Sequence, residues 1–85
     1  MNELMARFEQ AVQDSRLLSK KPDNGTLLQI YALYKQATLG NNPNKRPSFT
    51  DTLARLKHDA WKGLEGTTTQ QAMQNYIDLI ESLKN

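Results

Sequence analysis

Tyrosines and lysines at helical spacing are the residues of this chain best suited to hold a ligand. Tyr31 and Tyr34 are three residues apart and Lys35 follows Tyr31 by four, so a helix places all three on one side. Lys57 and Tyr76 add the same residue types further along the chain. Lysines suit phosphates, aromatic faces suit a flat ring and phenolic hydroxyls suit polar groups, which together indicate a nucleotide. The alternative is a pair of half-buried core tyrosines whose hydroxyls reach solvent.

The other polar residues argue against metal binding and catalysis. His58 is the only histidine and cysteine is absent, so neither a usual zinc ligand set nor thiol chemistry is available. No serine lies in a nucleophile-elbow pattern, and neither a P-loop nor a G-x-G-x-x-G sequence occurs. We therefore expect a protein that is not an enzyme and that needs no metal or cofactor.

The net charge of +2 conceals a separation of charge along the chain. Segment 16–62 holds nine bases and three acids, a local net charge of +6, whereas the two ends together carry −4. If the ends pack side by side, the protein has one basic face suited to a phosphate-bearing ligand. Solubility alone would explain such surface charge equally well.

Length and composition restrict the class of protein. With 85 residues, of which 38% are hydrophobic, the chain predicts one small domain over residues 1–85. Because cysteine is absent, packed regular elements must stabilise it, and a reducing compartment is permitted. Apolar runs are only a few residues long and the N-terminus lacks signal and transit features. We therefore expect a cytoplasmic protein without a membrane span.

Glycines and prolines lie only between or at the edges of periodic segments, and they divide the chain into four helical segments. Apolar spacing predicts a first helix over 2–15, beginning near Asn2. A turn over 20–25 then leads to a second helix, which we expect Thr26 to cap and which runs to about Leu39. The glycine that follows suits a left-handed C-terminal residue.

A long surface loop is predicted over 40–49, and a loop of this length in so small a domain more often serves a function. Thr50 or Asp51 should cap the third helix, which Gly63 or Gly66 ends.

The fourth helix should begin with a capping box, formed by Thr67 with Gln70 or by Thr68 with Gln71. The apolar stripes of the four segments are Leu4, Phe8, Ala11, Val12 and Ser15; Leu27, Ile30, Tyr31, Tyr34 and Ala37; Leu53, Leu56, Ala60 and Leu64; and Ala72, Met73, Tyr76, Ile77, Ile80 and Leu83.

Two long blocks of sequence are distinctive: residues 31–47 read YALYKQATLGNNPNKRP and residues 57–77 read KHDAWKGLEGTTTQQAMQNYI. Both resemble signature stretches of the acyl-CoA-binding protein family. The stretch FEQA at 8–11 resembles its opening F-x-x-A. The resemblance spans nearly the whole chain. It implies an all-α fold, a four-helix bundle of up-down-down-up topology whose long loop joins two parallel central helices.

The resemblance also implies which residues bind acyl-CoA. Tyr31, Lys35 and Lys57 stand where the family meets the 3′-phosphate of coenzyme A, and Tyr34 stands where it contacts adenine. The other matching head-group positions are occupied by Arg16, Lys21 and Tyr76. Apolar surface of the first two helices is expected to cover the acyl chain, with contributions from Val12, Leu18 and Leu28.

The implied function is that of a monomeric, non-catalytic carrier. We expect it to bind long-chain fatty acyl-CoA, to form an intracellular pool of these esters and to deliver them transiently to acyl-CoA-using enzymes. It should need no cofactor, no nucleic acid and no integral association with a membrane. The rival hypothesis is a small helical nucleic-acid-binding module that uses Arg46, Lys57 and the long loop. A third hypothesis is an acyl-CoA hydrolase.

Four positions depart from the family pattern. Leu53 stands where a lysine commonly faces the ligand, and His58 replaces a tryptophan. Gln29 and Thr52 replace aromatic residues. These departures predict either a weaker grip on the head group or an altered preference for acyl length. Trp61 matches the other tryptophan of the family and is expected in the core.

Overall fold

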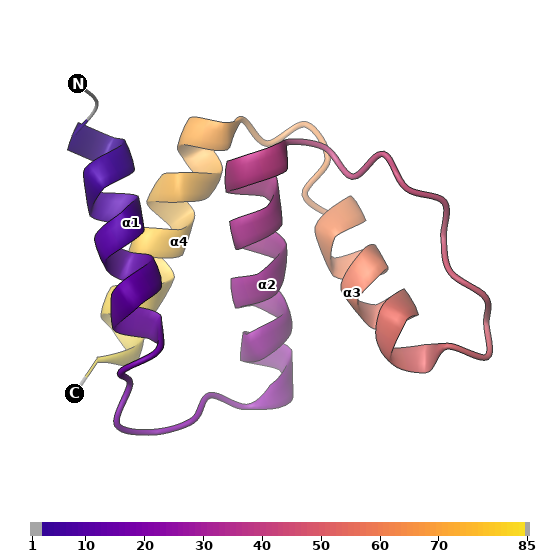
Figure 1. Ribbon diagram of the computed structural model, residues 1–85, viewed down its shortest axis with the longest axis horizontal. Helices are drawn as coiled ribbons and strands as arrows, with labels where there is room; N and C mark the ends of the chain where they lie inside the picture. Colours follow the sequence, from indigo (N-terminus) through magenta and orange to yellow (C-terminus); the bar gives the residue numbers. More distant parts are fainter. Residues whose placement is uncertain (1–2, 85) are drawn as a thin grey trace.

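The computed structural model describes residues 3–84, which form four helices (Figure 1). They are α1 (Glu3–Ser15), α2 (Asn24–Leu39), α3 (Thr52–Lys62) and α4 (Thr69–Leu83). Figure 1 shows α1 and α4 running in one direction and α2 and α3 in the other. The all-α fold and the up-down-down-up topology are therefore confirmed. The predicted helix start at Asn2 lies outside the described residues.

The four helices form an open bundle rather than a closed one. α4 packs against α1 and α2, and α3 packs against α2. Within residues 3–84, the Cα atoms of α3 stay more than 8 Å from those of α4, and the same holds for α1 and α2. The molecule is accordingly flat, with principal extents of 38, 31 and 14 Å. None of its described helices combines the length and apolarity needed to span a bilayer.

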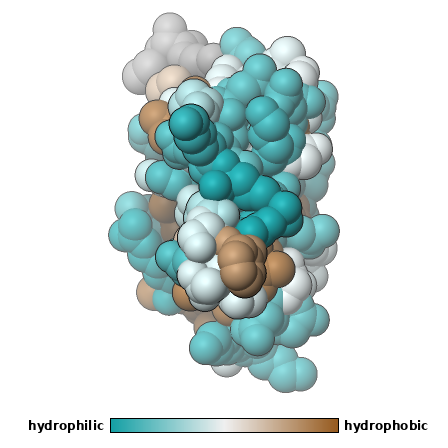
Figure 2. Space-filling model, turned by 90° about the vertical axis from the view of Figure 1, so that its right-hand side faces the viewer, coloured by the Kyte–Doolittle hydropathy of each residue, from teal (hydrophilic) through white to brown (hydrophobic). Residues whose placement is uncertain are grey.

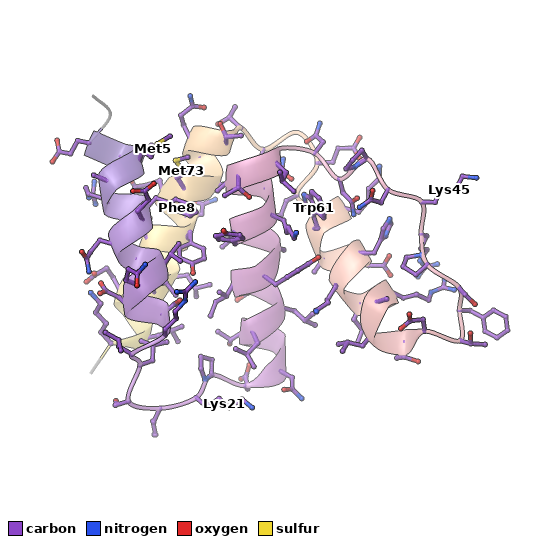
Figure 3. The ribbon with its side chains drawn as sticks, in the orientation of Figure 1. Met5, Phe8, Lys21, Lys45, Trp61 and Met73 are labelled. Atoms are coloured by element: carbon purple, nitrogen blue, oxygen red, sulfur yellow. The ribbon has the colours of Figure 1, made fainter. Side chains whose placement is uncertain are left out.

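The core lies where α4 meets α1 and α2. Ala72 and Ile80 of α4 are fully buried, and Figure 3 labels Phe8 of α1 and Met73 of α4 where these two helices lie side by side. The stripe predicted for the fourth helix is thus confirmed as the main source of core side chains. The buried cluster consists of Phe8, Ala11, Ala37, Ala72, Met73, Tyr76, Ile77 and Ile80.

The N-terminus of α2 corrects the sequence-based prediction. Asp23, not Thr26, is the capping residue, because its carboxylate accepts a hydrogen bond of 2.8 Å from the backbone N–H of Thr26. This bond helps to hold the pKa of Asp23 below its ordinary value. The helix therefore takes in Asn24 and Gly25, which we had assigned to the preceding turn.

The other helix ends select among the predicted alternatives. Asp51 caps α3 and Thr68 caps α4, each through a side-chain oxygen that accepts a backbone N–H three residues on. The capping box of α4 is only half formed, because the Gln71 side chain donates to Asn75 instead. Gly63 ends α3, as predicted. Gly40 follows α2 with the expected positive φ of 78°, but its ψ of −149° lies outside the left-handed helical conformation.

α3 contradicts its predicted apolar stripe. Leu53 is 61% exposed and Leu56 is 48% exposed, whereas Trp61 is buried as expected. The reason is that α3 packs against α2 alone, so much of its surface has no other helix to cover it. An apolar pattern on α3 therefore does not mark the core.

The acid-bearing ends of the chain lie side by side through the packing of α1 on α4. Lys84 joins them, with Nζ 2.8 Å from Oδ2 of Asp14 and 2.8 Å from Oε2 of Glu81. The hydrogen bond from Lys84 is the main reason that the pKa of Asp14 lies below its ordinary value. Most bases of segment 16–62 lie elsewhere, on α2, on α3 and in the loops.

Candidate functional site

The ring of Tyr31 lies close to two lysines from different helices. Nζ of Lys35, one turn further along α2, is 5.8 Å from the centroid of the ring. Nζ of Lys57, which comes from α3, is 5.2 Å from the same centroid. The packing of α3 on α2 therefore brings together Tyr31, Lys35 and Lys57 of the predicted set, and it places two positive charges near one phenol.

Trp61 of α3 lies beside this cluster. Its indole N–H donates a 2.8 Å hydrogen bond to the carbonyl of Gly40, which ties α3 to the end of α2. Nζ of Lys35 lies 5.6 Å from the centroid of the Trp61 ring, so the ammonium is near two aromatic rings. Within residues 3–84 it forms none of the ion pairs found at the surface.

Beside the cluster lies a small cavity of about 200 Å³, which we call the polar cavity because most of its lining residues are polar, although the surface that they expose to it is largely apolar. It opens between α2, α3 and the loop 40–51, which Figure 3 shows extending outward to Lys45. Figure 2 shows this side of the molecule, which is mostly hydrophilic around a small hydrophobic patch. The cavity is lined by Tyr31, Asn42, Asn44, Lys45, Pro47, Ala54, Lys57, His58 and Trp61.

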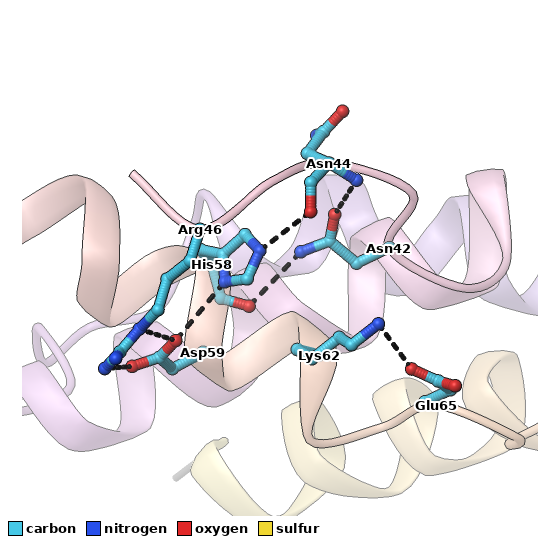
Figure 4. Close-up of polar contacts among 7 residues, drawn as sticks. All are labelled: Asn42, Asn44, Arg46, His58, Asp59, Lys62 and Glu65. Atoms are coloured by element: carbon cyan, nitrogen blue, oxygen red, sulfur yellow. Dashed lines mark hydrogen bonds and ion pairs between the residues drawn. The ribbon is translucent and has the colours of Figure 1, made fainter. Parts of the chain in front are cut away.

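Hydrogen bonds from α3 hold the loop that forms one wall of this cavity (Figure 4). Buried Asn42 donates to the carbonyl of His58 at 3.2 Å and accepts from the backbone N–H of Asn44 at 2.9 Å. Nε2 of His58 lies 3.0 Å from the carbonyl of Asn44. Arg46 donates to both carboxylate oxygens of Asp59, at 3.1 and 2.8 Å. These bonds fix the loop in place as one wall of the cavity.

The Arg46–Asp59 pair should be visible in acid titration. The hydrogen bonds from Arg46, followed by the one with His58, hold the pKa of Asp59 below its ordinary value of 3.8. The carboxyl of Asp59 is a stronger acid in the folded protein than in the unfolded one. The pair therefore stabilises the fold fully above pH 3.8, and this stabilisation is lost as the pH falls through the lowered pKa of Asp59. Arg46→Gln should therefore raise the pKa of Asp59, measured by carboxyl-carbon NMR.

The matched control for this titration is Lys62→Gln, which removes the neighbouring ion pair of Lys62 with Glu65. It should leave the titration of Asp59 unchanged. Equal midpoints for Asp59 in the wild type and in Arg46→Gln would contradict the assignment.

An apolar groove of about 340 Å³ lies next to the polar cavity, between α2 and α3. Leu28, predicted to contact an acyl chain, belongs to it, and so do the exposed leucines of α3. Tyr31 and Lys57 line both the groove and the polar cavity, so the two spaces meet at the cluster. The groove is lined by Asn24, Leu27, Leu28, Tyr31, Leu53, Leu56 and Lys57.

Tyr34 and Tyr76 belong to an aromatic group on the α1 side of α2. The ring of Tyr34, which is 41% exposed, stacks on Phe8 at 6.1 Å, and Tyr76 meets Phe8 edge-on at 5.1 Å. Tyr76 is buried, and its hydroxyl donates to Oγ of Ser15 at 3.3 Å. Burial raises the pKa of the Tyr76 phenol, and that hydrogen bond partly opposes the rise. Tyr34 is thus exposed to solvent, whereas Tyr76 is a core residue that lines neither the cavity at Tyr31 nor the groove beside it.

The remaining predicted residues are spread over the bundle. Lys21 lies in the loop that leads into α2 (Figure 3), and Arg16 lies just beyond α1, close enough to influence the Tyr76 phenol. Val12 packs against the core cluster, and Leu18 lines a different cavity with Lys84. Of the three predicted acyl contacts, only Leu28 lies with Tyr31 and Lys57.

Sequence reasoning missed most of the groove on α3. Leu53 was interpreted as a lost lysine contact and Leu56 as core, yet both line the groove. Their spacing with Lys57 was the available signal, because positions 53, 56 and 57 share one helical face. That signal could not be distinguished from a core stripe without knowing that α3 has a single neighbour.

The fold and the site together define a small all-α ligand-binding bundle with a lysine-rich aromatic cavity joined to an apolar groove. The model of the family "Acyl CoA binding protein" matches residues 5–80. The chain therefore belongs to the acyl-CoA-binding protein family.

Individual relatives agree with this assignment. The chain is 41% identical over 76 residues to an acyl-CoA-binding protein of Brassica napus, covering 89% of this chain and 83% of that one. The crystal structure of acyl-CoA-binding protein 2 of Oryza sativa superposes with a TM-score of 0.90 at 36% identity, covering 94% of this chain and 89% of the other.

A third relative shows the same domain in another setting. The chain is 42% identical to enoyl-CoA delta isomerase 2 of Rattus norvegicus over 78 residues, and this aligned region covers 92% of the chain. It spans only about 20% of the length of that isomerase. The similarity is therefore to a minor part of a much longer protein.

Proposed function

We propose that this protein binds long-chain fatty acyl-CoA and acts as a carrier of these esters. The observation that supports the proposal is the junction at Tyr31 and Lys57, where the polar cavity, with Lys45 and Lys57 in its lining, continues into the apolar groove. An acyl-CoA has the same division, with a phosphate-bearing nucleotide at one end and an aliphatic chain at the other. Lys35 and Lys57 would hold the 3′-phosphate, Tyr34 would face adenine, and the groove would cover the chain.

Simple energetics are consistent with this arrangement. A phosphomonoester carries a charge near −2 at neutral pH, and each charge-assisted hydrogen bond to it contributes roughly 1.5 to 3 kcal/mol. Each methylene removed from water contributes about 0.8 kcal/mol. The head group would thus set the orientation of the ligand, while chain length would tune its affinity.

Titration calorimetry tests the proposal with palmitoyl-CoA, free CoA and a DNA duplex. Palmitoyl-CoA should bind most tightly, and CoA should bind more weakly because it lacks the chain. Salt-sensitive binding of DNA without heat from palmitoyl-CoA would favour the nucleic-acid alternative instead. That alternative receives no support from the site, because Arg46, one of its required bases, is held by Asp59.

The proposed carrier has no catalytic step. Among residues 3–84 no group of histidine and carboxylate side chains could hold a metal ion, and His58 bonds to Asn44 and Asp59 rather than to a serine. The protein would act in the cytoplasm as a monomeric domain, passing its ligand to acyl-CoA-using enzymes. Release of thiol from bound palmitoyl-CoA over hours checks this proposal, and sustained turnover would replace the carrier with a hydrolase.

The phenol of Tyr31 has a role that can be tested separately. Tyr31→Phe keeps the ring between Lys35 and Lys57 but removes one hydroxyl, so it should weaken palmitoyl-CoA binding by about 1 to 3 kcal/mol without changing the fold. Thr38→Val is the matched control, since it removes a hydroxyl of α2 that bonds back to the carbonyl of Tyr34. Equal affinities in calorimetry for Tyr31→Phe and the wild type would exclude a hydrogen bond from the Tyr31 hydroxyl to the ligand.

A further inference from the structure

A second and larger apolar cavity, of about 520 Å³, lies between α2, α3 and α4. It occupies the space left because the backbones of α3 and α4 stay apart. Its volume is within the range of small-molecule sites, roughly 300 to 1,000 Å³. We call it the rear cavity; it is lined by Gly25, Leu28, Gln29, Ala32, Leu33, Ala60, Leu64, Asn75 and Leu79.

The chemistry of the rear cavity suits an uncharged aliphatic group. Six of its nine lining residues are leucine or alanine: three on α2, Ala60 on α3, Leu64 just beyond α3 and Leu79 on α4. None of the nine is ionisable, so a charged group would lose its hydration there without gaining a partner. Methylene groups, in contrast, gain by leaving water.

The rear cavity continues from the apolar groove. Leu28 lines both spaces, and its neighbours on each helix divide between them. On α2, Asn24 lines the groove and Gly25 lines the rear cavity; on α3, Leu56 lines the groove and Ala60, one turn later, lines the rear cavity. The two spaces are therefore successive along the α2–α3 contact, and Leu28 is the side chain at which they meet.

Small residues leave room at this junction. A Cβ atom added at Gly25 would meet only Oδ1 of Asp23, at 3.7 Å, so the first turn of α2 presents bare backbone there. Ala60 faces the same region with a single methyl group. Leu28, which lines both spaces, is itself only half-buried.

We propose that the rear cavity holds the distal end of a long acyl chain that passes Leu28 from the groove. This inference rests on the proposed function and names the ligand more closely. Short chains end in the groove beside Leu53 and Leu56, whereas longer chains bury their last methylenes against Ala60 and Leu79. The protein is thus selective for chains long enough to fill both spaces, and Leu28 and Ala60 determine that selectivity.

Calorimetry with dodecanoyl-CoA and eicosanoyl-CoA tests the inference on two filling variants. Ala60→Leu and Gln29→Phe each add volume at the rear cavity, and Gln29 is exposed, so its replacement leaves the core intact. Each variant should weaken eicosanoyl-CoA binding on the order of tenfold, the equivalent of roughly two methylenes returned to water. Binding of dodecanoyl-CoA should change less than about twofold in the same variants.

The control Ala6→Leu adds the same side chain as Ala60→Leu on the exposed surface of α1, and it should bind both esters as the wild type does. A direct measurement uses eicosanoyl-CoA labelled with ¹³C at its terminal methyl group. Nuclear Overhauser effects from that methyl to Ala60 and Leu79 would place the end of the chain in the rear cavity.

Three results would overturn the inference while leaving the proposed function intact. The first is that both filling variants weaken the binding of the two esters equally. The second is that the terminal methyl shows Overhauser effects to Leu53 alone. The third is that each protein chain binds two ester molecules. Failure of the wild type to bind either ester would instead overturn the proposed function itself.

Discussion

Replacing both Lys35 and Lys57 by alanine should weaken binding of palmitoyl-CoA by about 3 kcal/mol, on the order of 100-fold. The two ammonium groups come from α2 and α3 and lie on the same Tyr31 ring, so a phosphate placed there meets both. Lys57 is exposed and Lys35 is half-buried, and neither belongs to the core cluster. The free energy of unfolding should therefore remain close to that of the wild type.

A ligand without the 3′-phosphate makes this experiment specific. Calorimetry should show that the wild type binds 3′-dephospho-palmitoyl-CoA nearly as weakly as the double variant binds palmitoyl-CoA. The double variant should discriminate little between the two ligands, because the groups that recognise the phosphate are gone. If the double variant kept the full preference of the wild type for the phosphorylated ligand, the lysines would not be its phosphate contacts.

The matched control removes the same two charges elsewhere. Lys62 and Lys84 each form ion pairs at the surface, with Glu65 and with Asp14 and Glu81 respectively. The variant Lys62→Ala with Lys84→Ala should keep its affinity for palmitoyl-CoA within about threefold, the residual effect of net charge on association. A loss of affinity equal to that of the site variant would indicate a general electrostatic effect rather than a built phosphate site.

Ile80→Ala should lower the free energy of unfolding by about 3 kcal/mol, a large effect for a single substitution. Ile80 is 0% exposed and lies in the core cluster where α4 meets α1 and α2. The bundle is flat, and α4 packs against both α1 and α2. Little surrounding structure can therefore collapse into the space that alanine leaves. The midpoint of thermal unfolding should fall by more than about 10 °C.

Urea denaturation followed by circular dichroism measures this loss. The intermediate variant Ile80→Val should cost about 0.5 to 1.5 kcal/mol, since it removes one methyl group. Leu39→Ala is the surface control; Leu39 is 64% exposed, so its replacement should change stability by less than about 0.5 kcal/mol. Equal losses in Ile80→Ala and Leu39→Ala would show that α4 is not the centre of the core.

Gln36, whose role was not predicted, holds the start of the loop 40–51. Gln36 is fully buried, and its side-chain amide donates to Oδ1 of Asn41 at 2.9 Å and to the carbonyl of Thr67 at 2.8 Å. These bonds join the end of α2 to the start of the long loop and to the segment before α4. A glutamine in a helical pattern gives no indication of burial, because its partners come from segments distant in the sequence.

Local chemistry was sufficient to predict the four helices and their order. The positions of glycine and proline and the apolar spacing predicted all four described helices. The error at the start of α2 arose because two residues there could serve as the N-cap. Asp23 and Thr26 both carry a side-chain oxygen, and the backbone conformation decided in favour of Asp23, which is extended with φ of −69° and ψ of 170°.

Helical periodicity by itself determined that Tyr31 and Lys35 share one face of a helix. Only the tertiary structure decided that Lys57 joins them, that Leu53 and Leu56 line a groove, and that Leu28 separates from Val12 and Leu18. The physical reason is that sequence spacing fixes which side chains point the same way, whereas packing fixes which of those faces is covered. α3 has one neighbour, so its apolar face remains open and becomes the wall of the proposed site.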